Sequence, residues 1–206
     1  DWDFCQIQYN YMDTDVQAGD KGYALAEQKG IPMVIMEPVR GGLLAGFSDD
    51  IEEMFRETRP DQSIASWALR WVGSHANVKV ILSGMSTPEQ VEDNLKTFDH
   101  FETLSEKEQD TVKRVVDTLK GRVQNGCTGC RYCMPCPSGV DIPGSFRIWN
   151  DYHIYQKYSV VQNRWEKELS ADAKPENCVE EQCPQKISIR EHLKRVQAEL
   201  DHPVWK

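Results

Sequence analysis

Hydrophobic and polar positions along the first 120 residues predict strands and helices in alternation. Three short apolar runs are typical of strands, at residues 4–10, 32–36 and 78–82. The run at 32–36 is continuously apolar, as expected for a strand that is buried on both faces. A helix is predicted between the first two runs, ending near Lys29, because Gly30 suits a helix C-terminus. Alternation of this kind predicts a parallel α/β layer.

Capping signals predict where later helices begin. In a capping box, the side chain of a Ser or Thr accepts a hydrogen bond from the backbone N–H three residues later. The Glu or Gln side chain at that later position accepts from the backbone N–H of the Ser or Thr. Such pairs begin three predicted helices: Thr87 with Gln90, Ser105 with Glu108, and Ser188 with Glu191. Helical spacing of apolar residues predicts a further helix that begins near Ile64. The polar segment 46–60 has no pattern that predicts an element.

The composition changes after Gly121, where cysteine, proline and glycine become frequent. We therefore predict two domains, residues 1–120 and 121–206. Aromatic residues are concentrated at positions 143–170: Phe146, Trp149, Tyr152, Tyr155, Tyr158 and Trp165. We interpret them as a helical pair that packs against the cysteine-containing domain or the α/β part. The alternative is a shield that excludes water from a metal cluster held by the cysteines described below. The last helix carries one apolar stripe: Ile189, Leu193, Val196 and Leu200.

Overall composition excludes several classes of function. The net charge of −9 opposes nonspecific binding of nucleic acid, which needs a basic surface. No stretch of about 18 apolar residues is present, so no membrane span is expected. Seven cysteines without an apolar leader predict a reduced protein of the cytoplasm.

Four cysteines follow one another at a three-residue period, namely Cys127, Cys130, Cys133 and Cys136, with Pro137 directly after the last. In bacterial-type ferredoxins, the first three cysteines of such a run hold one [4Fe–4S] cluster, and the Cys before Pro binds a different cluster. A second Cys-Pro pair, Cys183–Pro184, lies downstream and is preceded by Cys178.

The ligand set predicted for one cluster is Cys127, Cys130, Cys133 and Cys183. Cys136 and Cys178 remain as candidate metal ligands, but two thiolates do not complete a second four-thiolate site. Structural zinc is the alternative, because four-cysteine zinc sites also use two-residue spacings. Zinc pairs, however, are usually separated by a longer loop, and no histidine lies near this run. We interpret Cys5 as a small buried hydrophobe.

In their order along the chain, these segments resemble the aldo/keto reductases that are fused to a C-terminal ferredoxin-like domain. Residues 4–10, 34–42 and 80–94 look like barrel strands six, seven and eight with the segments that follow them. The resemblance implies an α/β fold: the last three β/α units of a TIM-type (β/α)8 barrel, then a mostly helical ferredoxin-like Fe–S domain. A complete barrel takes about 250 residues. No segment matches the family's catalytic Asp, Tyr, Lys and His, so no catalytic residue is assigned.

The resemblance also implies that this chain holds half of an NAD(P)H site. Gln6 would bond the nicotinamide carboxamide at the end of its strand, Met36 would lie against the ring, and Val39 and Gly41 would follow the pyrophosphate. The implied contacts to phosphate, ribose and adenine are Ser83, Gly84, Ser86, Gln90, Asp93 and Asn94. From the residues alone, the segment 83–86 is equally an ordinary strand-to-helix connection.

Two functions follow as expectations. The first is an iron–sulfur oxidoreductase that reduces a small carbonyl substrate with NAD(P)H when its barrel is complete. The alternative is a non-catalytic electron-transfer or assembly subunit, which docks a partner chain that supplies the missing barrel strands.

Overall fold

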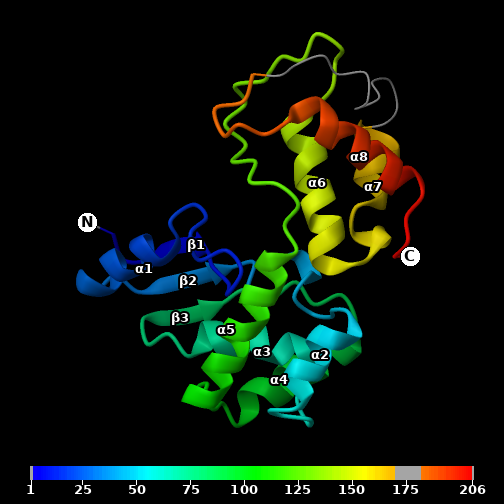
Figure 1. The fold of residues 1–206 in the computed structure, drawn as a ribbon. Helices are drawn as coiled ribbons and strands as arrows, with labels where there is room; N and C mark the ends of the chain where they lie inside the picture. Colours follow the sequence, from blue (N-terminus) through cyan, green and yellow to red (C-terminus); the bar gives the residue numbers. More distant parts are fainter. Residues whose placement is uncertain (1, 170–181, 206) are drawn as a thin grey trace. The chain divides into compact units, whose positions relative to one another are not determined.

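A computed structural model describes residues 2–169 and 182–205 of the 206-residue chain (Figure 1). The chain divides into two compact units, Asp1–Asp117 and Thr118–Lys206. Each unit has a hydrophobic cluster of its own, and each is described by itself. Among the described residues, every helix is too short or too polar to span a bilayer.

Unit 1 contains a three-stranded parallel sheet of order β1-β2-β3 (Figure 1). The strands are β1 (Cys5–Gln8), β2 (Met33–Met36) and β3 (Val78–Ile81). All three predicted strands are confirmed, although each is shorter than the apolar run that predicted it. The continuous apolar run forms the central strand β2, where Met33 and Ile35 are fully buried on one face and Val34 and Met36 are half-buried on the other, so the expected burial of both faces is only partly met. The parallel α/β layer is therefore confirmed.

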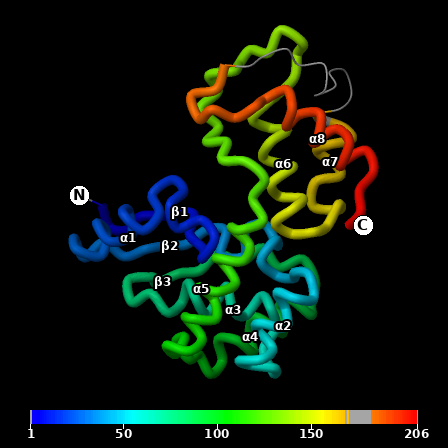
Figure 2. The backbone as a smooth tube through the Cα atoms, viewed as in Figure 1, coloured from blue at the N-terminus to red at the C-terminus, as the bar shows by residue number. Residues whose placement is uncertain are grey.

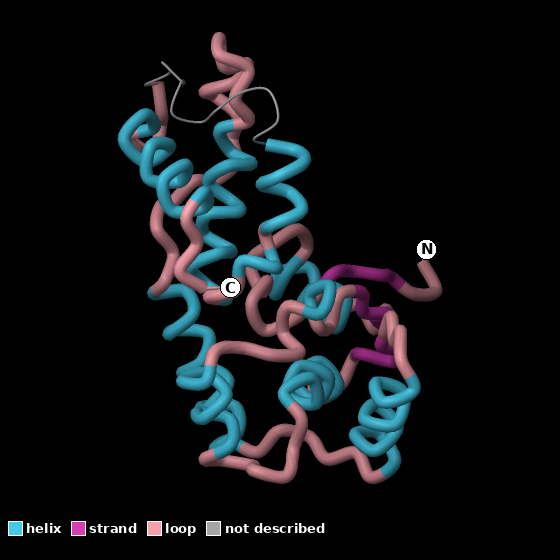
Figure 3. The backbone as a smooth tube through the Cα atoms, turned by 90° about the vertical axis from the view of Figure 1, so that its right-hand side faces the viewer, coloured by secondary structure: helices cyan, strands magenta, loops and turns pink. Residues whose placement is uncertain are grey.

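Helices follow each of these strands along the chain (Figure 3, helices cyan and strands magenta). They are α1 (Gly19–Gln28), the 3-10 turn η1 (Arg40–Gly42), α2 (Asp49–Arg56), α3 (Ile64–Gly73), α4 (Pro88–Asp99) and α5 (Glu106–Gly121). Gly30 ends the first helical segment with a left-handed φ of 66°, as expected. Helix α2 fills the polar segment for which no element was predicted, and it buries Ile51 and Phe55 one helical turn apart.

One of the three predicted capping boxes is complete, one is half made because the Gln90 side chain accepts from the N–H of Ser86 and not of Thr87, and the third is not made. The Thr87 side chain accepts from the backbone N–H of Gln90, and Ser105 and Glu108 bond each other reciprocally. Ser188 stands at the N-cap of its helix, but its side chain makes no capping hydrogen bond there. The predicted start of the helix after Ser188 is confirmed, but the predicted capping hydrogen bond is wrong. Backbone angles do not explain the difference, because Asp141 caps its helix with a similar ψ of 87°.

Unit 2 is mostly helical in the part that the structure describes. Its elements are α6 (Ile142–Tyr155), η2 (Tyr158–Val160), α7 (Gln162–Arg164), the π-helical turn η3 (Trp165–Leu169) and α8 (Ile189–Asp201). Helices α6 and α8 lie side by side (Figure 1). Most of the aromatic residues are buried in the core between these elements, with Trp149, Tyr152 and Trp165 at most 2% exposed. The four residues of the apolar stripe on α8 are buried there too.

Candidate functional site

One pocket of unit 2 is lined by four cysteines: Cys127, Cys130, Cys133 and Cys183. These are the four residues that the spacing assigns to one cluster. The cavity itself measures about 20 Å³, and the wider empty space of about 320 Å³ around it includes open solvent. Its apolar walls include Ile142 and Phe146 from the first turns of α6, and Ile189 from the start of α8.

Three of these cysteines lie in the loop that connects α5 to α6 and contains no helix or strand (Figure 2). It curls because two residues between the cysteines adopt left-handed backbone conformations, Gly129 with φ of 68° and Arg131 with φ of 61°. The segment 182–188, which carries Cys183 and leads into α8, lies beside this loop (Figure 2). The pocket therefore forms where two segments distant in sequence meet.

The cysteine thiols affect one another electrostatically. Burial raises the pKa of Cys127, and the neighbouring Cys183 and Cys130 raise it further, against an opposing hydrogen bond from the backbone N–H of Gly129. Burial likewise raises the pKa of Cys133, and Cys127, Cys183 and Cys130 add to that shift. Several thiolates in one half-buried pocket repel one another and are poorly solvated. A bound cationic centre would remove this penalty, because thiolates are the usual ligands of iron–sulfur clusters and of zinc.

The remaining cysteines lie elsewhere. Cys136 is 6% exposed, in the hydrophobic core of unit 2, and it is not among the residues that line the pocket. Cys178 lies outside the described residues. Cys5 is half-buried, not fully buried as expected, and its sulfur lies 3.0 Å from that of Met33. No disulfide bond joins any of the six described cysteines.

The residues expected to hold the nicotinamide half of NAD(P)H lie on the first two strands and the turn that follows. Gln6 is exposed and pairs in register with Val34, so it lies inside β1 and not at the end of the strand. Met36 ends β2 and is half-buried. Val39 and Gly41 lie in the turn after β2, and Gly41 has a left-handed φ of 62°.

The residues expected to reach phosphate, ribose and adenine lie between β3 and the middle of α4. Asn94 donates to the Ser83 hydroxyl at 3.0 Å, and the backbone N–H of Ser86 donates to Gln90 at 2.7 Å. Asp93 accepts from the Ser63 hydroxyl at 2.6 Å, and Gly84 has open space where a Cβ would stand. These contacts are what an ordinary strand-to-helix connection needs, and they leave both interpretations of this segment open.

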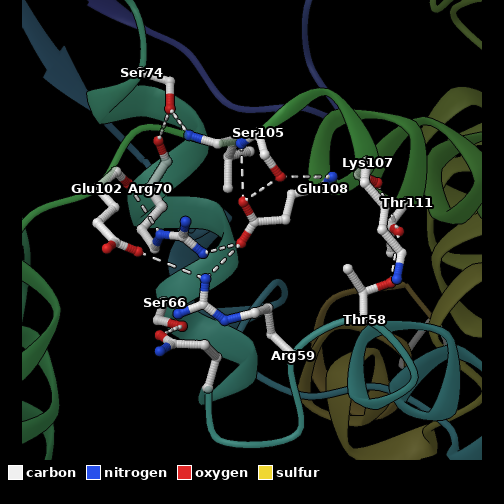
Figure 4. Close-up of polar contacts among 12 residues, drawn as sticks. Thr58, Arg59, Ser66, Arg70, Ser74, Glu102, Ser105, Lys107, Glu108 and Thr111 are labelled. Atoms are coloured by element: carbon white, nitrogen blue, oxygen red, sulfur yellow. Dashed lines mark hydrogen bonds and ion pairs between the residues drawn. The ribbon is translucent and has the colours of Figure 1, made fainter.

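Neither the charged cluster of unit 1 nor the polar contacts before Cys127 were predicted from sequence. Arg70 donates to the Glu108 carboxylate at 2.7 Å, and Arg59 does so at 3.3 Å (Figure 4). The Ser105–Glu108 capping pattern did mark Glu108, but no local pattern connects it with Arg70 on α3. In unit 2, Asn125 and Asn150 bond each other and the start of the cysteine loop. No local signal marks this pair either.

Comparison with known proteins gives one family match. A model described as the aldo/keto reductase family matches residues 1–117, which is 117 of the 206 residues. No curated protein matches the chain. Among solved structures, the holo and apo forms of the aldo-keto reductase AKR11C1 from Bacillus halodurans are each similar at 22% identity and a TM-score of 0.42. Each match covers 53% of this chain and 41% of that protein, so the chain spans about two fifths of its length.

Proposed function

The chain belongs to the aldo/keto reductase family, and on that premise we propose that it is part of an iron–sulfur oxidoreductase. Unit 1 contributes to an NAD(P)H site, and unit 2 binds one [4Fe–4S] cluster. In the complete enzyme, NAD(P)H supplies a hydride for the reduction of a small carbonyl substrate. The catalytic Asp, Tyr, Lys and His of the family are not matched in this chain, which therefore contributes binding residues to that reaction.

The observation that carries the proposal is the pocket that Cys127, Cys130, Cys133 and Cys183 line together. Four thiolates are the ligand set of a [4Fe–4S] cluster. Zinc would draw four sulfurs to about 2.3 Å from one point. Among the described residues, no group of three or more His, Cys, Asp or Glu side chains is arranged to hold a metal ion. The preference for a cluster over zinc therefore rests on the continuous three-residue spacing of the cysteines and not on the geometry of the pocket.

When bound, such a cluster accepts and releases one electron. The residues of this chain then have three tasks: the cysteines hold the iron, the backbone N–H of Gly129 bonds the Cys127 sulfur, and Phe146 with Ile189 keeps water from one side. A reducing compartment such as the cytoplasm keeps the thiols available for iron.

Anaerobic reconstitution of the full chain with ferrous iron and sulfide tests the cluster. We expect about four iron and four sulfide per chain, as one [4Fe–4S] cluster requires. Replacement of Cys133 by Ser should lower the iron content sharply, whereas Cys5→Ser, on a half-buried cysteine of β1, should leave it unchanged. Cys136→Ser discriminates further, because retention of the full iron content confirms that Cys136 is not a ligand. Zinc without sulfide in the purified chain contradicts the proposal.

Unit 1 is tested separately, by titration of the chain with NADPH and NADH. We propose that Gln6 bonds the carboxamide, and that Met36, Val39 and Gly41 contact the nicotinamide and pyrophosphate. The segment from Ser83 to Asn94 would bind phosphate, ribose and adenine, at the N-terminus of α4, where backbone N–H groups favour anions. Ser86→Asp should weaken binding through repulsion of phosphate, and Ser159→Asp, at an exposed position of η2 in unit 2, serves as a control of equal charge. Equal affinities of the two variants would contradict this placement.

A second candidate, a subunit that docks a partner chain, is favoured by the open flanks of the sheet. In the described part of unit 1, β1 and β3 each pair with β2 alone. Large apolar side chains are exposed beside or on the edge strands, Phe4 and Val80, and on the helices α1 and α4, Leu25, Leu95 and Phe98. Unpaired strand edges and exposed apolar side chains are typical of surfaces that pair with further structure. A partner that carries the remaining β/α units fits this surface.

Gel filtration of the full chain with and without a co-expressed partner tests docking. Leu95→Glu, at an exposed position of α4, should weaken the complex, and Val204→Glu in unit 2 should not. A stable monomer in both variants and in the wild type counts against this second function.

A further inference from the structure

The chain that leads into the cysteine loop is fixed by two asparagine side chains. Residues 122–127 follow α5 and belong to no helix or strand, so their backbone groups need other hydrogen-bond partners. The Asn150 side chain, on α6, accepts from the backbone N–H of Gln124 at 2.9 Å and of Asn125 at 3.2 Å. It also donates to the carbonyl of Asn125 at 3.1 Å. One side chain thus satisfies three backbone groups.

Asn125 continues these contacts to the first cysteine. Its side chain is buried, with the residue 8% exposed, and its carbonyl oxygen accepts from the backbone N–H of Cys127 at 3.1 Å. Its amide nitrogen lies 3.4 Å from Nδ1 of His192 on α8. The amide nitrogen only donates, so Nδ1 of His192 must accept, which leaves any ring proton of the neutral imidazole on Nε2. Each amide orientation is therefore fixed by its own partners.

The same histidine lies against the wall of the pocket. The His192 ring contacts the rings of Phe146 and Trp149 edge-on, at 6.1 and 5.6 Å between centroids. Phe146 lines the cysteine pocket, and α8 is the helix that follows Cys183. The contacts of Asn125 thus connect the loop of Cys127 to both helices whose first turns line the pocket.

We propose that Asn125 and Asn150 are positioning residues, which hold Cys127 in its metal-binding place before any metal arrives. This inference rests on the proposed cluster in unit 2. Neither residue lines the pocket; both act through the backbone that precedes Cys127 and through the N–H of Cys127 itself. Groups that orient a metal ligand from the second layer commonly change metal affinity by roughly 10–100-fold when they are removed.

The test is the rate at which the reconstituted full chain loses iron to an iron chelator under anaerobic conditions. Asn150→Ala should release iron roughly 10–100-fold faster than the wild type. Asn150→Asp keeps an acceptor for both N–H groups and should fall between the two. Asn163→Ala is the matched control, because Asn163 is an exposed residue of α7, and it should release iron at the wild-type rate.

Two further measurements separate positioning from a general loss of stability. The amide proton of Cys127 in the metal-free chain should exchange faster in Asn150→Ala, while the core amides of α6 and α8 keep their protection. The electron paramagnetic resonance spectrum of the reduced cluster should change in Asn150→Ala and not in Asn163→Ala.

Equal iron-release rates in Asn150→Ala and the wild type would overturn this inference without contradicting the proposed cluster. A wild-type chain that takes up no iron and sulfide would overturn the proposed function itself.

Discussion

The carboxylate of Glu108 is buried in unit 1 and is held by donors from three positions in the sequence (Figure 4). Arg70 donates at 2.7 Å, the hydroxyl and N–H of Ser105 at 2.7 and 2.8 Å, and Arg59 at 3.3 Å. Burial alone would raise the pKa of Glu108, but the hydrogen bonds from Arg70 and Ser105 outweigh it and lower the pKa to about 2. The charged form of Glu108 is therefore strongly favoured in the folded chain.

Replacement of Arg70 by Met should destabilise unit 1 strongly. It leaves the buried Glu108 carboxylate without its main partner, which typically costs about 3–5 kcal/mol. Arg56→Met removes an ion pair with Glu52 whose arginine side chain is 48% exposed, and exposed pairs contribute at most about 1 kcal/mol. Urea unfolding of both variants measures their free energies of unfolding. Similar losses in the two variants would contradict the prediction that the buried pair stabilises unit 1 more than the exposed pair does.

Acid should weaken unit 1 through Glu108. The folded pKa is about 2 against an ordinary 4.5, so the unfolded chain binds a proton first as the pH falls. The stability that ionised Glu108 contributes to the folded chain is present above about pH 4.5 and is lost as the pH falls towards 2. The total loss in the free energy of unfolding is about 3 kcal/mol. Glu108→Gln should lose stability at pH 6 and depend less on pH in this window. Parallel pH profiles of the variant and the wild type would contradict this assignment.

At the scale of elements, two helices begin with the same sequence pattern and differ in structure. Ser105 caps the start of α5 and bonds Glu108 in return. Ser188 precedes α8 in the same pattern with Glu191, yet its side chain makes no capping hydrogen bond. The strands and most helices were predicted because their signal is local periodicity. The capping difference was not predicted, because both serines stand in the same local pattern.

Alanine substitutions should separate the two serines. Ser105→Ala removes the N-cap of α5 and should lower the stability of unit 1 by about 1 kcal/mol. The loss should be larger because the substitution also removes the hydrogen bond from the Ser105 hydroxyl to the Glu108 carboxylate. Ser188→Ala should change the stability of unit 2 by a few tenths of a kcal/mol at most, since surface changes away from such contacts are nearly neutral. Unfolding of each unit is measured by hydrogen exchange of its core amides. A larger loss for Ser188→Ala would show that the cap of α8 forms in solution.

At the scale of the whole molecule, the two units have separate cores. The cluster around Met33 and Ile35 lies in unit 1, and the cluster around Trp149 and Leu193 lies in unit 2. A ligand that binds only one folded unit stabilises that unit by mass action. The metal centre proposed for unit 2 is built from that unit's residues alone, so its effect on stability should be confined to that unit.

Calorimetry of the full chain should therefore show two transitions, of which only one responds to metal. Reconstitution with iron and sulfide should raise the midpoint of unit 2 and leave that of unit 1 in place, because metal binding contributes to folding where the ligands lie. Cys133→Ser should abolish the rise. A single transition that shifts as a whole would mean that the two units unfold together.

The sequence by itself determined the order of strands and helices, the change of character after Gly121, and the three cysteines that one tight loop presents together. These features depend on residues close in the chain, where periodicity and spacing act directly. Only the tertiary structure decided that Cys136 is buried in the hydrophobic core of unit 2. It also decided that Arg70 meets Glu108, and that Asn150 holds the start of the cysteine loop. Such contacts arise from the packing of distant segments, which no local pattern records.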